Sequence, residues 1–152
     1  MLHPEFTINH MLLNVLERSP DKVYIVEGDR RFSYGMLERQ ASSLAHALKQ
    51  HGIVRDDRVG IYLDKSWEAV VSIMAVVQVG AVFVNIGPLL KEPQVRHIMS
   101  NCGVKLLIAD ADKVEGLTLP ELDVAFYRGN SRPECSWAKE WLPLDEVFNS
   151  GA

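Results

Sequence analysis

The sequence has little of what marks several common protein classes. Its only two cysteines, Cys102 and Cys135, form no CxxC or Cys/His spacing that would indicate a metal site. We therefore expect two free thiols in a reducing compartment rather than a disulfide framework. No run of basic residues with interleaved aromatics occurs, and the formal net charge is −4. Nucleic acid is accordingly not an expected partner.

Long apolar runs and a leader sequence are missing as well. The longest apolar stretch, Ala69 to Ala75, contains Ser72 and is far shorter than the ~20 residues that span a bilayer. The N-terminus has no basic segment followed by an apolar one, so we expect no signal peptide. These absences predict a cytoplasmic protein without a membrane span.

Familiar phosphate-binding and catalytic motifs are also absent. The ten glycines form neither GxGxxG after a strand nor GxxxxGK[ST], and no GxSxG turn occurs. The five histidines are scattered. His46 and His51 lie off a shared face of one predicted helix, so a metal pair there is not expected.

What remains is the composition of one soluble globular domain. The chain has 152 residues, of which 47% are apolar and 24% charged, and these are ordinary values. A chain of this length buries roughly 68–70% of its unfolded surface, which is enough for a substantial core. We therefore treat residues 1–152 as a single domain.

The stretch from Arg58 to Asp110 alternates short apolar strands with helices. Strands are predicted at 58–63, 81–86 and 104–109, and helices at 67–79 and 93–101. Strands that are apolar on both faces, joined by helical crossovers, are typical of a parallel sheet covered by helices on both sides. The helix at 67–79 is apolar nearly all round, so we expect it to be sandwiched between other layers.

The flanking segments complete the predicted fold. A helix at 6–18 and a hairpin at 23–33 precede a long helix that Ser33 caps and Gly52 follows. After the central stretch we predict a short helix within 110–119, a fourth strand at 123–127, a loop at 128–141 and a last helical turn at 144–148. The fold class is three-layer α/β. A mostly parallel sheet of about four strands has helices on both faces, and the N-terminal helix and hairpin pack on its edge.

Two aspartates follow predicted parallel strands. Asp64 and Asp110 lie at the carboxyl ends of their strands, the edge at which open α/β sheets usually bind ligands. An acidic pocket there would need a basic partner at a further strand end, and no lysine follows the fourth strand. We therefore favour simple helix N-capping by both residues. If the chain is a free-standing module, its ligand is expected near Asp64, Gly87 and Asp110.

Two charged groups have competing interpretations. Arg30 and Arg31 are suited to an anion, but charged residues on an exposed hairpin are more often a solvated face. Asp64, Lys65 and Ser66 open the apolar helix, whose N-terminus carries partial positive charge and suits a phosphate. Without further glycines, capping is the favoured interpretation.

Three stretches together resemble one family. They are Phe32-Ser-Tyr-Gly-Met-Leu37, then Gly52 through Leu63, then Gln78-Val-Gly-Ala-Val-Phe-Val-Asn-Ile-Gly-Pro88. In this order they resemble the opening of the adenylate-forming superfamily of AMP-forming acyl-CoA synthetases, luciferases and peptide-synthetase adenylation domains. Val79 stands where that family usually has alanine, and Asn85 where proline is common. The resemblance covers about residues 6 to 110. Residues 87–98 are further similar to acyl-CoA ligases associated with bacterial exosortase systems.

The resemblance implies an activity for a longer polypeptide. Such enzymes join a carboxylate to ATP, release pyrophosphate and pass the acyl group to a thiol, usually that of coenzyme A; ATP, magnesium and coenzyme A are the implied cofactors. Their chemistry uses a Ser/Thr/Gly-rich loop with a lysine, a Tyr-Gly-x-Thr-Glu stretch, a ribose-binding aspartate and a late lysine. None of these occurs here, where Thr7 and Thr118 are the only threonines.

We therefore assign no catalytic, cofactor-binding or metal residue. The resemblance implies that the chain is an N-terminal subdomain, inert alone, whose partner is the remainder of the enzyme. Two other classes stay open, which are a free-standing α/β binding module and an incomplete domain that forms a homodimer through an exposed apolar face.

Overall fold

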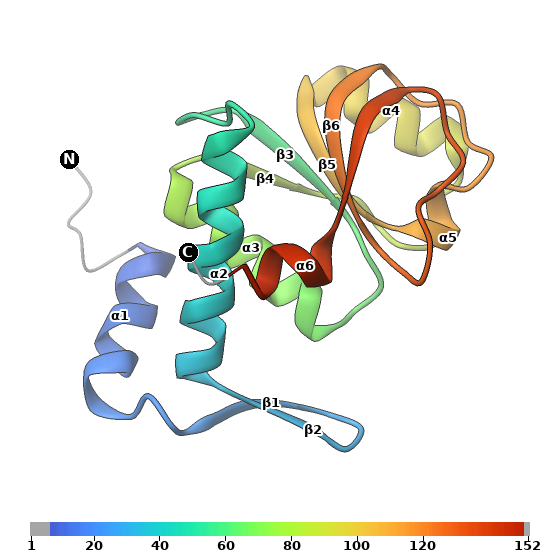
Figure 1. The fold of residues 1–152 in the computed structure, drawn as a ribbon. Helices are drawn as coiled ribbons and strands as arrows, with labels where there is room; N and C mark the ends of the chain where they lie inside the picture. The colour runs from blue at the N-terminus through green and yellow to red at the C-terminus, as the bar shows by residue number, and fades with distance from the viewer. Residues whose placement is uncertain (1–6, 151–152) are drawn as a thin grey trace.

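The computed structural model describes residues 7–150, and Figure 1 shows their helices and strands. The predicted start of the first helix, at residue 6, lies outside the described residues. In chain order the elements are α1 (Ile8–Arg18), β1 (Val23–Glu27), β2 (Arg30–Ser33), α2 (Tyr34–Gln50), β3 (Arg58–Tyr62), α3 (Trp67–Val79), β4 (Val82–Asn85), α4 (Glu92–Cys102), β5 (Val104–Asp110), α5 (Ala111–Val114), β6 (Leu122–Arg128), β7 (Ala138–Pro143) and α6 (Leu144–Phe148).

The main sheet has five parallel strands in the order β4-β3-β5-β6-β7. The prediction of about four strands was one short, because β7 lies mostly within the segment 128–141 that was expected to be a loop. Along β7, Ala138 and Trp141 are buried while Lys139 and Glu140 are exposed. Exposed charges on an edge strand block pairing with another chain. Here two adjacent charged residues also interrupt the alternation of apolar and polar residues by which a strand is predicted.

Helices cover both faces of this sheet, which confirms the three-layer α/β prediction (Figure 1). On β5, Leu106 and Ile108 pack into a core shared with α2, α3 and α6, whereas Leu107 and Ala109 face a second core with α4 and α5. Alternate residues of the same strand thus reach opposite apolar layers, as the two-sided apolar pattern of the strands predicted.

Helix α3 is sandwiched, as its all-round apolar sequence predicted. The Ser66 hydroxyl caps its start by accepting a hydrogen bond from the Ala69 N–H at 3.2 Å. Gly80 ends it in the left-handed region at φ 81°, where glycine is favoured. The buried Ser72 hydroxyl donates to the Glu68 carbonyl at 2.7 Å, so the helix buries this polar group without leaving it unsatisfied.

The N-terminal helix and hairpin do not pack on the edge of the sheet, contrary to the prediction. Helix α1 contacts α2 and α3, and Figure 1 shows it beside α2, away from the strands. The Phe32 ring stacks on the Trp67 ring, with centroids 4.1 Å apart and planes 7° from parallel. The hairpin thus packs on the ring of Trp67, the first residue of α3. Helix α1 extends the helical layer that α2 and α3 form.

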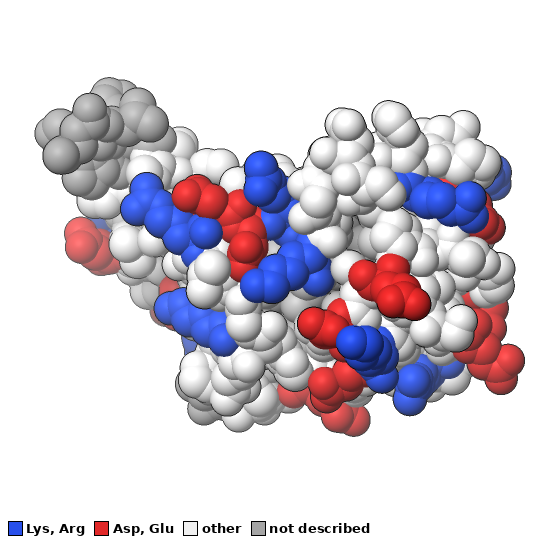
Figure 2. All heavy atoms as spheres, turned by 90° about the horizontal axis from the view of Figure 1, so that it is seen from above, with Lys and Arg blue, Asp and Glu red and all other residues white. Residues whose placement is uncertain are grey.

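In residues 7–150, none of the helices has both the length and the apolar character that a membrane span needs. On the face seen in Figure 2, acidic and basic side chains are interspersed.

Candidate functional site

The strand order creates a switch point between β3 and β5. From β3 the chain passes through α3 to β4 on one side, and then through α4 to β5 on the other. Because α3 and α4 lie on opposite faces, the chain diverges at the carboxyl ends of β3 and β5. Ligands of open α/β sheets usually bind at this point. Asp64 follows β3, and Asp110 is the last residue of β5.

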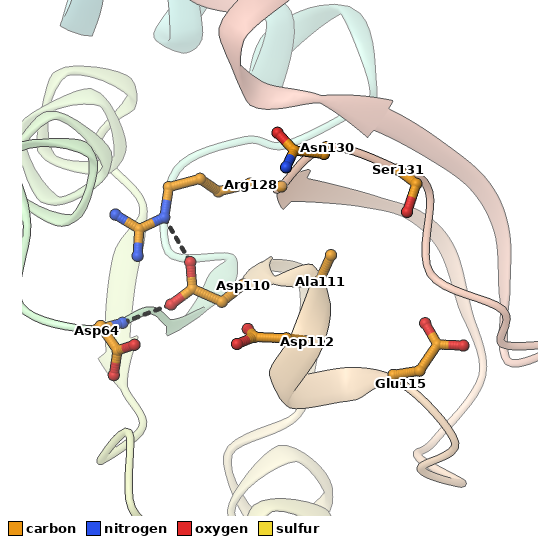
Figure 3. A pocket seen from close by; sticks show the side chains of 9 residues that line it. Asp64, Asp110, Ala111, Asp112, Glu115, Arg128, Asn130 and Ser131 are labelled. Atoms are coloured by element: carbon orange, nitrogen blue, oxygen red, sulfur yellow. Dashed lines mark hydrogen bonds and ion pairs between the residues drawn. The ribbon is translucent and has the colours of Figure 1, made fainter.

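An open hollow of about 560 Å³ lies at this edge of the sheet. We call it the carboxyl-edge hollow; Figure 3 shows most of its side chains. Its lining carries four carboxylates and one guanidinium, and consists of Asp64, Asp110, Ala111, Asp112, Glu115, Arg128, Gly129, Asn130 and Ser131. The structure therefore brings together Asp64 and Asp110, whereas Gly87, the third residue expected near them, does not line this hollow.

Asp110 is held by two donors, as the dashed lines in Figure 3 mark. Its carboxylate accepts the Asp64 N–H at 2.7 Å and the Arg128 Nε–H at 2.5 Å. The side chain is only 5% exposed. Capping by Asp110 is therefore wrong, since its side chain makes no capping hydrogen bond to α5. The basic partner that the acidic-pocket interpretation requires is Arg128, which directly follows the predicted fourth strand; the absence of a lysine there does not exclude it.

Asp64 does not cap α3 either, because Ser66 fills that role. The Asp64 carboxylate instead pairs with the Lys113 ammonium at 2.9 Å. This hydrogen bond raises the pKa of Lys113 above its ordinary value. The same ammonium donates to the Pro88 carbonyl at 3.2 Å. Lys113, which the sequence did not single out, thereby ties the loop after β4 to the loop after β3.

A further buried carboxylate contacts Arg128, which lines the hollow. Glu68, at the start of α3, is 7% exposed and pairs with Arg128 at 3.1 Å. Its other oxygen pairs with Arg30 of the hairpin at 3.3 Å. Arg30 also pairs with Glu27, and this hydrogen bond lowers the pKa of the Glu27 carboxyl. Arg30 is therefore engaged by carboxylates of its own chain, while Arg31 is exposed as expected.

No cysteine or histidine in the described part of the chain lines the carboxyl-edge hollow. Both cysteines are free thiols, and burial raises the pKa of Cys135. Across the described residues, no group of three or more His, Cys, Asp or Glu side chains is arranged to hold a metal ion. His51 packs edge-on against the Phe126 ring at 5.9 Å, which is a core contact rather than a ligand arrangement.

The carboxylates of the hollow are largely engaged by donors of the chain itself. Asp64 is held by Lys113, Asp110 by Arg128, and Glu115 accepts the Glu134 N–H at 3.1 Å. Chemistry by an acid and a base needs groups free to exchange protons with a substrate. In this structure three of the four carboxylates of the hollow instead contact donors of the chain itself.

Comparison with known proteins gives a family match and more distant relatives. Residues 13–145 match the family described as AMP-binding enzyme. The N-(5-amino-5-carboxypentanoyl)-L-cysteinyl-D-valine synthase of Penicillium rubens is 34% identical over 110 residues, covering 72% of this chain and 3% of that protein. The medium/long-chain-fatty-acid–CoA/3-oxocholest-4-en-26-oate–CoA ligase of Mycobacterium tuberculosis is 32% identical over 111 residues, covering 71% of this chain and 20% of that protein.

Solved structures align over nearly the whole chain. The anthranilate CoA ligase AuaEII, in complex with anthranoyl-AMP, aligns with a TM-score of 0.86 at 24% identity. The alignment covers 99% of this chain and 29% of that one. The chain thus spans a fifth or less of the length of these curated relatives and under a third of the solved structure.

Proposed function

The chain belongs to the AMP-binding enzyme family, and on that premise we propose that it is the N-terminal scaffold portion of a longer AMP-forming acid–thiol ligase. Membership confirms the resemblance to the adenylate-forming superfamily. The observation that carries the proposal is the family match over 13–145 in a chain that covers only 20% of the M. tuberculosis CoA ligase. The sequence also lacks the lysine-bearing Ser/Thr/Gly-rich loop.

The proposed reaction has two steps. A carboxylate attacks the α-phosphate of ATP, giving acyl-AMP and pyrophosphate; a thiol then takes the acyl group and releases AMP. We infer that the thiol is that of coenzyme A, which the names of the M. tuberculosis and AuaEII relatives support. The peptide product named for the Penicillium synthase supports a carrier-protein thiol as the competing acceptor. ATP, magnesium and coenzyme A are cofactors of the intact enzyme in this proposal, and this portion binds none of them.

The motifs that resemble the family have structural roles here, which supports the scaffold assignment. Phe32 stacks on Trp67, and the Ser33 hydroxyl caps α2 by accepting the Met36 N–H at 3.2 Å. Leu37 is 2% exposed in the core. The third motif supplies the C-terminal cap of α3, the edge strand β4 and the turn after it.

ATP–pyrophosphate exchange tests the proposal. The assay compares three samples: the chain alone, the remainder of the enzyme encoded downstream in the same reading frame, and both expressed as one polypeptide. Only the joined polypeptide is expected to exchange pyrophosphate in the presence of a carboxylic acid, and then to form a thioester with coenzyme A. Exchange by the chain alone would refute its inertness. A stop codon directly after Ala152, or a joined polypeptide inactive with every acid offered, would refute the ligase assignment.

The hollow of about 560 Å³ at the switch point favours a second candidate, a free-standing ligand-binding module. Self-association is a third candidate, for which light scattering would show a homodimer. The cytoplasmic location, the remainder of the enzyme as partner and the likeness to exosortase-associated ligases stay predictions.

A further inference from the structure

Five charged side chains form one connected series, which we call the ion-pair chain. Glu27 pairs with Arg30 on the hairpin, and Arg30 pairs with Glu68 of α3 at 3.3 Å. Glu68 pairs with Arg128 of β6 at 3.1 Å, and Arg128 pairs with Asp110 of β5 at 2.5 Å. Because Arg128 and Asp110 both line the carboxyl-edge hollow, the series runs without a break from the hairpin to the switch point.

The middle members of the ion-pair chain are shared and largely buried. The Glu68 side chain is 10% exposed, and each of its two oxygens takes a different guanidinium. The Arg128 side chain is 25% exposed and contacts two carboxylates through different nitrogens. Removing one member of a buried pair leaves its partner uncompensated. A change at one end of the series therefore alters the contacts available to the next member.

Two hydrogen bonds to backbone N–H groups also join the hollow and the hairpin to the segment that leads into α3. Asp110 accepts the Asp64 N–H at 2.7 Å, four residues before Glu68. At the other end, the Glu27 carboxylate accepts the Trp67 N–H at 3.2 Å. The loop between β3 and α3 is thus held at its start by Asp110 and at its end by Arg128 and Glu27. Hairpin and hollow converge on the first turn of α3.

We propose that the ion-pair chain energetically couples the carboxyl-edge hollow to the β1–β2 hairpin. Loss of the Asp110 charge loosens the hairpin, and loss of Arg30 loosens the hollow, although these two side chains lie at different ends of the series. The coupling acts in both directions, because a coupling free energy between two sites is reciprocal. It does not depend on the reaction of the intact enzyme.

Amide hydrogen exchange on the 152-residue chain tests the coupling in both directions. Asp110→Asn is expected to raise exchange of the hairpin amides in Val23–Ser33 at least threefold, relative to the amides of the core strands. Arg30→Met, at a half-exposed position, is expected to raise exchange of the Asp64 amide at least threefold by the same reference. This amide reports directly on the hollow because its hydrogen bond is to Asp110.

Asp57→Asn is the matched control. Like Asp110, Asp57 accepts a backbone N–H, that of Val54 at 2.8 Å, and pairs with a cation, Lys105 at 3.1 Å. Asp57 lies before β3, outside the ion-pair chain. Asp57→Asn should therefore leave the exchange of the hairpin amides unchanged relative to that of the core-strand amides. Should Asp110→Asn fail to fold, Arg30→Met alone decides. The comparison uses the hairpin amides for Asp110→Asn and the Asp64 amide for Arg30→Met. If either of these variants folds and changes the exchange of those amides no more than Asp57→Asn does, the coupling is absent and the proposal is overturned.

Discussion

Replacing Arg128 by methionine removes a guanidinium that contacts two buried carboxylates. Methionine keeps much of the apolar stem, so the main loss is the charge. The side chains left behind are Asp110, 5% exposed, and Glu68, 10% exposed. Breaking a buried pair costs about 3–5 kcal/mol. Because Arg128 is itself a quarter exposed, water can partly replace it, and we expect a loss of about 2–4 kcal/mol in the free energy of unfolding.

Urea unfolding followed by tryptophan fluorescence measures this loss, since Trp67, Trp137 and Trp141 are all buried in the fold. A loss of that size is a large fraction of the roughly 5–15 kcal/mol that stabilises a typical domain. Arg128→Lys should recover only part of it, because an ammonium is a point charge that does not reproduce the two-sided contact.

Lys139→Met is the control for removing a cation from an ion pair. Lys139 pairs with Asp123 at 3.0 Å, but the side chains are 75% and 87% exposed. Exposed pairs typically contribute about 0–1 kcal/mol. If Arg128→Met costs no more than Lys139→Met, the buried carboxylates do not need their guanidinium and the reasoning from burial is refuted.

Three further predictions concern groups outside the ion-pair chain. The Trp137 indole N–H donates to a backbone carbonyl at 3.1 Å, whereas that of Trp141 is buried without a partner in residues 7–150. In urea unfolding, Trp137→Phe should therefore lower the free energy of unfolding by about 1 kcal/mol more than Trp141→Phe does. Equal losses would contradict this. The pKa of Asp57 is lowered chiefly by the Val54 N–H, so its contribution to stability is present above the ordinary carboxyl pKa of about 3.9 and is lost as pH falls through the lowered value. Urea unfolding of Asp57→Asn should therefore show a deficit at pH 7 that shrinks below about pH 4, and a deficit unchanged down to pH 2 would count against the shift. Burial raises the pKa of the Cys135 thiol, so in a Cys102→Ser background its alkylation rate should reach half-maximum at a higher pH than that of a free thiol; a midpoint at or below the free value would exclude the effect.

Local sequence signals predicted much of the fold. Ser33 before an apolar stripe, Gly80 after α3 and the Gly28-Asp29 turn act within a few residues of their own positions. Such signals depend on backbone conformations and short hydrogen bonds that the neighbouring residues supply. The structure therefore has these caps and this turn where the sequence predicts them.

The features that were missed depend on pairing between distant residues. Arg128 follows the predicted fourth strand directly, but only the parallel register that places it opposite Asp110 makes it the partner of that carboxylate. The stacking of Phe32 on Trp67 likewise joins residues from separate elements, and it decides where the hairpin packs. Periodicity along the chain does not specify such contacts.

The strand order has a consequence for how the chain folds. Residues of β3 pair with β5 as Arg58 with Val104 and Tyr62 with Ala109, so the centre of the sheet closes across the whole α3–β4–α4 segment. Non-local parallel pairing of this kind slows folding. During synthesis, β3 and β4 emerge well before β5 and leave one long side of β3 without a partner. Unpaired strand sides of this type are where partly folded chains aggregate, so we expect chains truncated before Val104 to be insoluble while those extending past α6 are recovered in solution.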